Sequence, residues 1–468
     1  MPKLILRLRM PIFDRCGPVR RLRATVQAQA ELAKMAGWSF ASAVIARSAN
    51  LLALMICARL LSLEQFGLVA IIQSTVGMFG PIAGLGLSVT TTKFLAEYRD
   101  KDRARAGRIL AMSFSLAVFA GALMTAALIL FAPQLATNGL GSAALTRPLI
   151  QASGLLLLSV IESVQTGALV GLEAFSRIAH LSVWNGVLSI PVVALLAYKY
   201  GASGAIAGLT IALLWTCVLN GIILHGECRK RDIHPSFTGW AQERNVLFMF
   251  SLPSYVSGIV VAPITWMTSA LLVKQSGGLA EMALFSAADR FRFLLIFVPI
   301  AVSRIAVPTL TRLHAAGDSG GYRNALRWNV GFGVLATIPP VLLCMSLSRP
   351  LMMSFGKTFG DGWPVLAVLA FSAIPTVLNT QLGAPLLSEN RAWTRTGIDA
   401  ALAVTFLLSA WWMVPIWKAL GLAMAFAVAY SCACLLLWIS LRNAPNRARK
   451  DAPAEQEAPG APILVKSS

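Results

Sequence analysis

The chain has 468 residues, a formal net charge of +20, 57% hydrophobic residues and 13% charged residues. An ordinary soluble domain has roughly 25% charged residues, and the apolar residues here come in runs of about twenty, the length that spans a bilayer. This balance excludes a water-soluble fold and predicts an all-α, polytopic membrane protein of about twelve transmembrane helices. The basic residues lie between the apolar runs and no DNA-binding motif accompanies them, so we expect no nucleic acid partner.

In chain order, residues 1–35 are a basic arm without the apolar core and cleavage site of a secretory signal, expected in the cytoplasm or at the membrane surface. Residues 36–224 follow as a predicted N-terminal bundle of six spans. Their ranges are 36–58, 66–91, 108–132, 148–171, 178–198 and 203–224.

A polar cytoplasmic connector, 225–245, leads to a predicted C-terminal bundle of six spans over 246–441. Their ranges are 246–272, 282–308, 325–347, 363–387, 394–416 and 419–440. The remaining residues, 442–468, are rich in Ala, Pro, Glu and Arg and are expected to form a disordered cytoplasmic tail.

Loop charge predicts the orientation. About 29 of the 40 Lys and Arg residues lie in segments on the side of the amino terminus, and about 7 in the opposite loops. Because cytoplasmic loops carry an excess of Lys and Arg, both termini are expected in the cytoplasm. The halves match at an offset of about 216 to 217 residues, so they are expected to share one orientation about a pseudo-two-fold axis along the membrane normal, with a substrate site between them.

Four arginines lie inside predicted spans and more than three residues from either end of the span. A charge at the bilayer centre costs at least about 2.5 to 3.5 kcal/mol, so such residues normally face a wet cavity or a partner. Arg290 and Arg304 lie about 40° apart around one helix and about 21 Å apart along it, which predicts that they line one cavity at two depths. We predict that Arg47, with Asn50 beside it, lines the same cavity from the other half. Arg292 points about 160° away from Arg290, and Asp289 lies three residues before it, which favours a structural ion pair.

Two further acidic residues inside spans, Glu162 and Asp399, are candidates for proton or cation coupling, because a carboxyl group in a low-dielectric site can hold a proton near neutral pH. The alternative is that each pairs with a buried arginine. The seventh span carries Pro253, Gly258 and Pro263, and interior prolines bend helices, so we predict that it is a gate helix; packing alone is the alternative.

Enzyme signatures are absent from the sequence: it has no phosphate-binding glycine loop, paired-histidine zinc motif or nucleophile elbow. The seven cysteines are scattered and mostly within apolar runs, so we expect no disulfide framework, no metal site and no cofactor. A membrane-embedded glycosyltransferase or polymerase is the less favoured alternative. Such an enzyme is expected to have a long external loop with acidic residues, and the predicted external loops are all short.

Short motifs occur in a recognisable order. The stretch ARLLSLEQFG (Ala58 to Gly67) precedes GLGLS (from Gly84) and a basic loop; in the second half come PTLTRL (from Pro308) and SENRAW (from Ser388). In order and spacing, over about residues 36 to 441, these resemble the polysaccharide transporters of the multidrug/oligosaccharidyl-lipid/polysaccharide (MOP) exporter superfamily.

The resemblance implies two six-helix bundles that flip undecaprenyl-diphosphate-linked oligosaccharide across the bacterial inner membrane by alternating access. It implies a lipid-linked oligosaccharide as ligand, membrane lipids as surroundings, and a polysaccharide polymerase and a chain-length regulator as partners. A cation-coupled multidrug exporter of the same superfamily is the alternative, but such an exporter is expected to carry a carboxylate where the first span here carries Arg47.

Overall fold

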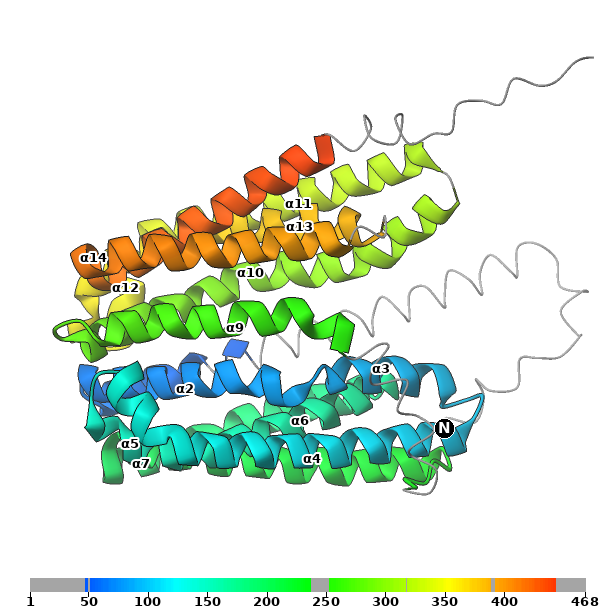
Figure 1. The fold of residues 1–468 in the computed structure, drawn as a ribbon, viewed down its shortest axis with the longest axis horizontal. Helices are drawn as coiled ribbons and strands as arrows, with labels where there is room; N and C mark the ends of the chain where they lie inside the picture. The colour runs from blue at the N-terminus through cyan, green and yellow to red at the C-terminus, as the bar shows by residue number, and fades with distance from the viewer. Residues whose placement is uncertain (1–46, 49–50, 237–251, 317, 389–391, 443–468) are drawn as a thin grey trace, which may run out of the picture. The chain divides into compact units, whose positions relative to one another are not determined.

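The computed structural model describes residues 47–48, 51–236, 252–316, 318–388 and 392–442, and every regular element within them is a helix (Figure 1). The predicted basic arm, Asn50 and the tail beyond Arg442 lie outside the described residues. Helices are expected throughout, because a bilayer offers the backbone no water and a helix satisfies its hydrogen bonds within one segment.

The described chain forms two compact units that do not follow the predicted halves everywhere. Unit 1 holds the described residues up to Leu61, then Phe79–Ala132, then the described residues of Thr146–Ser254. Unit 2 holds Ser62–Met78, Pro133–Leu145 and the described residues from Tyr255 onward. The beginning of one early helix and one early loop therefore belong to the unit that contains the second half of the sequence.

Unit 1 is organised around α6 (Ser153–Gly171), which packs against α3 and α7. The other helices of this unit are Leu51–Leu60, the end of α2 (Leu63–Gly84), α3 (Leu87–Tyr98), most of α4 (Arg103–Gln134), α5 (Thr146–Gln151) and α7 (Phe175–Lys230). A Cβ on Gly167 of α6 would overlap the backbone carbonyl of Ser88 in α3. Small residues at such contacts let membrane helices approach closely, and the Thr92 hydroxyl donates a hydrogen bond to the Gly167 carbonyl at 2.9 Å.

The predicted second span, 66–91, is interrupted in the structure. The helix α2 ends at Gly84 and α3 begins at Leu87, while Leu85 and Gly86 between them have φ angles of 46° and 69°. Glycine adopts this left-handed conformation without steric cost, whereas leucine does so under strain. The apolar run is continuous through this point, so hydropathy alone does not reveal the break.

The two longest helical segments are helical hairpins. In α7 the backbone leaves the helical region at Gly201 (φ 61°, ψ −140°), and a Cβ on Gly208 would lie 2.8 Å from the Cα of Val193. Residues fifteen apart in a straight helix are about 22 Å apart, so the chain reverses at Gly201. The second hairpin is in α14 (Ala392–Arg442), which turns at Lys418 and brings Gly421 against the Met413 carbonyl. Both turns fall between the predicted spans 178–198 and 203–224, and 394–416 and 419–440.

Unit 2 is a helical bundle in which α10 (Gly278–Ala315), α11 (Ser319–Ser346), α13 (Trp363–Ser388) and α14 pack side by side (Figure 1). Its other elements are the start of α2, the π-helical turn η2 (Leu135–Gly139), the short η3 (Ala143–Leu145), α9 (Leu252–Val273) from Tyr255 onward, α12 (Ser348–Met353) and η6 (Lys357–Gly362).

The start of α2 is anchored firmly in unit 2. A Cβ on Gly67 would overlap the carbonyl of Leu279 at the start of α10, so only glycine allows this approach. Next to it, the ring of Phe66 packs edge-on against Phe355 and Phe359, at centroid distances of 6.1 and 5.5 Å. Apart from their burial, such aromatic pairs contribute about 0.5 to 1.5 kcal/mol each.

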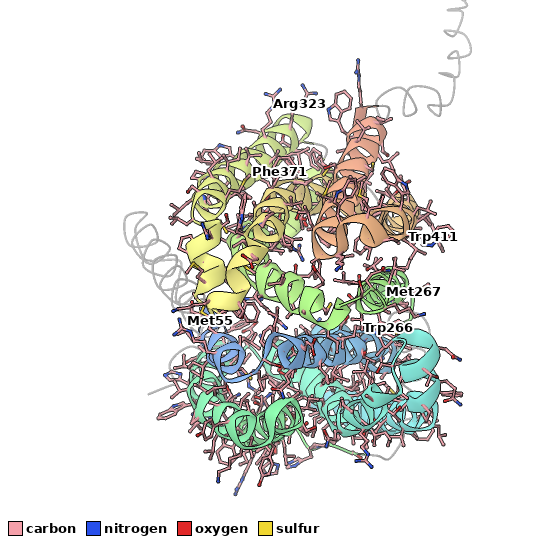
Figure 2. The ribbon with its side chains drawn as sticks, turned by 90° about the vertical axis from the view of Figure 1, so that its left-hand side faces the viewer. Met55, Trp266, Met267, Arg323, Phe371 and Trp411 are labelled. Carbon is pink, nitrogen blue, oxygen red and sulfur yellow. The ribbon has the colours of Figure 1, made fainter. Side chains whose placement is uncertain are left out.

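Seven helical segments within the described residues are long and apolar enough to cross a membrane, and two of these are the hairpins α7 and α14. Large apolar side chains point outward: Phe371 and Trp411 lie at the surface of their helices and are 50% and 70% exposed (Figure 2). A water-soluble monomer rarely shows such extensive apolar surface, whereas lipid tails solvate it.

Candidate functional site

A cavity of about 440 Å³, which we call the Arg290 cavity, lies within unit 2. Three helices line it, each with residues spaced by three or four positions, the spacing of one helix face. From α2 these are Ala70, Gln73, Ser74, Gly77 and Met78; from α9, Ala262, Thr265, Trp266 and Ser269; from α10, Met282, Phe285, Ser286, Asp289, Arg290 and Phe293. The cavity has the size of a small-molecule site.

Arg290 is a charged residue of this wall, and its hydrogen-bond partner is an uncharged side chain. Its guanidinium donates a hydrogen bond to the side-chain carbonyl of Gln73 at 2.7 Å. Among the residues that the structure describes, no carboxylate lies within ion-pair distance of Arg290. Nearby, the indole nitrogen of Trp266 donates to the Thr75 hydroxyl at 2.9 Å, so two side-chain hydrogen bonds join α2 to α9 and α10. The wall therefore presents a cation that an anionic ligand can neutralise.

Asp289 and Arg292 form an ion pair, with Nε of Arg292 2.6 Å from the carboxylate. Arg292 is buried, at 5% exposure, and its guanidinium lies over the ring of Phe426 at 4.2 Å from the centroid. This cation–π contact provides a second source of stabilisation for a desolvated charge. Arg292 faces away from the Arg290 cavity, in agreement with the angle expected between the two residues on one helix.

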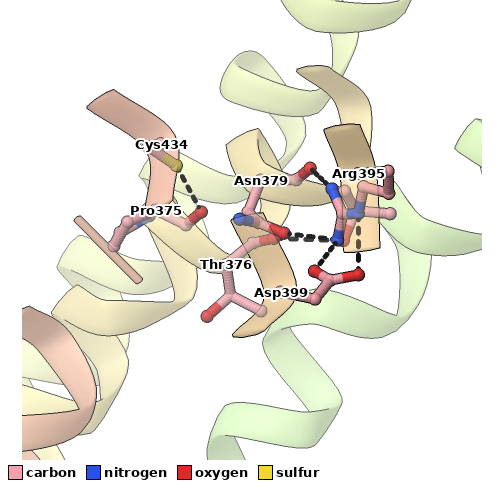
Figure 3. A network of polar contacts seen from close by, with 7 residues as sticks. Pro375, Thr376, Asn379, Arg395, Asp399 and Cys434 are labelled. Carbon is pink, nitrogen blue, oxygen red and sulfur yellow. Dashed lines mark hydrogen bonds and ion pairs between the residues drawn. The ribbon is translucent and has the colours of Figure 1, made fainter. Parts of the chain in front are cut away.

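A second cavity, of about 360 Å³ and here called the Asn379 cavity, lies among α9, α10, α13 and α14 of unit 2. At its wall Arg395 donates to the backbone carbonyl and the side-chain carbonyl of Asn379, at 3.0 and 2.9 Å (Figure 3). The same guanidinium pairs with Asp399 at 2.8 Å. Asp289 and Arg292 also line this cavity, so both of its described ion pairs are complete.

The other residues predicted to line the cavity, Arg47, Asn50 and Arg304, are not found in the wall of either cavity within the described part of the chain. Arg47 is an exposed residue of unit 1 and is not part of the wall of either cavity. Arg304 lies in α10, but its side chain, like Asn50 as a whole, is outside what the structure describes. The shared cavity that these residues were predicted to line therefore stays a prediction for Arg47, Asn50 and Arg304.

The candidate coupling residues have different surroundings. Glu162 lies on α6 of unit 1, partly buried, and accepts a hydrogen bond from the Thr166 hydroxyl at 2.7 Å. Asp399 instead pairs with Arg395, which is the alternative considered for it from the sequence. The predicted gate helix is α9, with Pro263 in its interior. Pro253 and Gly258 lie on the same helix, and their burial is outside the description.

Three residues of these sites were missed in the sequence: Gln73, Trp266 and Asn379. Uncharged amides and single aromatic residues are common in membrane helices, so their type alone singles out none of them. Gln73 contacts Arg290 across 217 residues of sequence, and no local pattern shows a contact of that separation.

The chain matches the family described as "Polysaccharide biosynthesis protein" over residues 32–314, more than half of its length. It is 24% identical to the EPS I polysaccharide export inner membrane protein EpsE of Ralstonia nicotianae, over 86% of this chain and 92% of the relative. It is also 26% identical to the succinoglycan biosynthesis transport protein ExoT of Rhizobium meliloti, over 72% of this chain and 65% of that protein.

Solved structures of low sequence identity share the fold. An inward-facing multidrug resistance MATE family transporter of the MOP superfamily superposes with a TM-score of 0.73 at 15% identity, over 86% of this chain and 96% of the other. The lipid II flippase MurJ in an inward closed conformation gives 0.68 at 14% identity, over 86% and 87%. The fold is thus that of the MOP transporters. The protein is a multi-pass membrane protein, not an enzyme, and belongs to the polysaccharide biosynthesis protein family.

Proposed function

We propose that the protein is a flippase that moves undecaprenyl-diphosphate-linked oligosaccharide repeat units across the bacterial inner membrane for the synthesis of O-antigen, capsule or exopolysaccharide. The observation that carries this proposal is Arg290, a guanidinium in a cavity wall whose partner is the neutral amide of Gln73. A diphosphate offers anionic oxygens in the geometry that a guanidinium binds through paired donors. The family and the two relatives, one named for export and one for transport of a polysaccharide, support the same cargo class.

The proposal includes the full predicted architecture: twelve spans, two halves about a pseudo-two-fold axis and both termini in the cytoplasm. Alternating access then moves the site from one side of the membrane to the other. Arg47 and Arg304 are proposed as further contacts for the anionic group, α9 as the gate, and a polysaccharide polymerase and a chain-length regulator as partners that use the product.

Cation coupling is proposed at Glu162 in preference to Asp399. The carboxylate of Asp399 already has a fixed cationic partner, the guanidinium of Arg395 at 2.8 Å. Glu162 has a hydroxyl partner and no ion pair among the described residues. A carboxylate without a fixed cation is the better place for an exchangeable proton or metal cation. The cationic wall at Arg290 disfavours the cationic drugs that a multidrug exporter carries.

The direct test replaces Arg290 with glutamine in a strain that depends on this gene. We expect surface polysaccharide to be lost while lipid-linked repeat units accumulate and the protein stays in the membrane. With purified protein, the affinity for undecaprenyl diphosphate should fall about 10- to 150-fold, the effect of losing about 1.5 to 3 kcal/mol of charge-assisted hydrogen bonding.

Arg323→Gln provides the matched control, because Arg323 is an exposed residue on α11 outside both cavity walls (Figure 2). This variant should behave like the wild type in both assays. Normal surface polysaccharide and unchanged affinity in Arg290→Gln would refute the assignment of the diphosphate to this cavity.

A further inference from the structure

We infer that the Asn379 cavity binds an uncharged sugar ring of the lipid-linked oligosaccharide whose diphosphate is held at Arg290. This inference rests on the proposed function and adds a separate subsite to it. Four features of the cavity carry it: its position, its charge balance, its unused hydrogen-bonding groups and its aromatic wall.

The two cavities share a wall. Residues of α9 and α10 line both of them: Thr265, Ser269, Phe285, Asp289 and Phe293. A ligand with its charged group at Arg290 therefore has its adjoining part beside the Asn379 cavity. In a lipid-linked oligosaccharide, the group attached directly to the diphosphate is a sugar.

Charge distinguishes the two cavities. In the wall of the Asn379 cavity, Arg292 is paired with Asp289 and Arg395 with Asp399, so two cations meet two carboxylates. Arg290 adds a further cation to the neighbouring cavity alone. An anion or a cation entering the Asn379 cavity would have to displace an existing pair, whereas a neutral polar ligand leaves both pairs in place.

The hydrogen-bonding groups of the cavity match hydroxyls. Arg395 is a donor only, so its contact with the side chain of Asn379 fixes the amide oxygen toward Arg395 and leaves the nitrogen Nδ2 pointing away from it (Figure 3). Asn379 is 3% exposed, and this Nδ2 has no partner within the described chain. A buried donor of this kind costs stability until it meets an acceptor.

Acceptors lie beside this donor. Thr376 donates its hydroxyl proton to the Ser372 carbonyl, and Thr380 donates to the Thr376 carbonyl, so both hydroxyl oxygens retain lone pairs. A sugar hydroxyl both donates and accepts, and can therefore meet the Asn379 amide and a threonine oxygen together.

An aromatic wall complements the polar one. Phe426 and Tyr430 are stacked at 4.5 Å between centroids, and both line the cavity. Arg292 lies over the Phe426 ring as well, so Tyr430 is the ring proposed to contact the ligand. A pyranose ring has a face of C–H groups and a rim of hydroxyls, so it can lay the C–H face against Tyr430 while its rim meets Asn379. This combination favours a sugar over a purely apolar ligand such as a drug or a lipid chain.

The test measures the affinity of the full chain in nanodiscs for undecaprenyl diphosphate, and for the same lipid carrying one glucose, galactose or N-acetylglucosamine. We expect at least one sugar to tighten binding to the wild type. In Asn379→Ala that gain should fall about 3- to 10-fold, the effect of one hydrogen bond, while the bare lipid binds as before. Thr376→Val, a near-isosteric change in the same wall, should also reduce the gain in affinity. This variant tests the inference if Asn379→Ala does not fold.

The control is Asn329→Ala, which removes another buried amide of unit 2 that also has an unpartnered nitrogen but lines neither cavity. It should keep the full gain. The inference is overturned if none of the sugars improves binding to the wild type, or if the folded Asn379 and Thr376 variants keep the gain. The proposed function fails separately, if Arg290→Gln binds the bare lipid as well as the wild type does.

Discussion

Replacing Asp289 with asparagine should destabilise the protein more than the equivalent change at Asp399. The carboxylate of Asp289 lies 2.6 Å from Arg292, whose side chain is 6% exposed. Removing one partner of a buried pair leaves the other charge uncompensated and costs about 3 to 5 kcal/mol. The contact of Arg292 with Phe426 is present before and after the change, so it does not offset this cost. Arg395 is more exposed, at 20%, and keeps two hydrogen bonds to Asn379, which limits the loss for Asp399→Asn to about 1.5 to 3 kcal/mol.

Thermal unfolding of the detergent-solubilised protein, followed by size-exclusion chromatography with fluorescence detection, gives the order of stability. We expect the midpoint to fall furthest for Asp289→Asn. The double variant Asp289→Asn with Arg292→Gln should recover much of the loss, because two neutral amides replace the unpaired charge. A single variant that unfolds at the wild-type temperature, or a double variant less stable than the single one, would refute the claim that an unpaired charge causes the loss.

Two further changes test other parts of the molecule. Gly67→Val should abolish stable expression, because the valine side chain would overlap the Leu279 carbonyl. Gly77→Val on the same helix is the control, because a Cβ there meets open space, and this variant should express normally. Equal expression of the two variants would contradict the close approach of α2 and α10. Glu162→Gln should lower transport of a fluorescent lipid-linked substrate into vesicles and remove its dependence on pH, and an unchanged pH profile would leave Glu162 with a structural role.

The helices were predictable for two reasons. An apolar run of about twenty residues has the length that spans a bilayer. Within the bilayer, a helix satisfies the backbone hydrogen bonds inside one segment. The gaps between predicted spans at residues 199–202 and 417–418 contain the hairpin turns at Gly201 and Lys418. The break at Leu85 was not predictable from hydropathy, because it changes the backbone conformation and leaves the apolar pattern intact.

The local partners of charged residues were also within reach of the sequence. Helical geometry alone separates Arg290 from Arg292, and the structure places them in the walls of different cavities. The pair of Arg395 with Asp399, four residues later on the same helix, is also local. Long-range partners were not within reach, and no local pattern shows that Arg395 bonds to Asn379, sixteen residues earlier. Nor does any local pattern show that Ser62–Met78 belongs to unit 2.

The hydrogen bond between Gln73 and Arg290 has a consequence for the charge of the empty cavity. A carboxylate in the place of Gln73 would cancel the charge of the guanidinium, whereas the amide oxygen orients Arg290 and leaves its positive charge in place. An anionic ligand therefore displaces an uncharged group from Arg290 and does not compete with an anion of the protein for it.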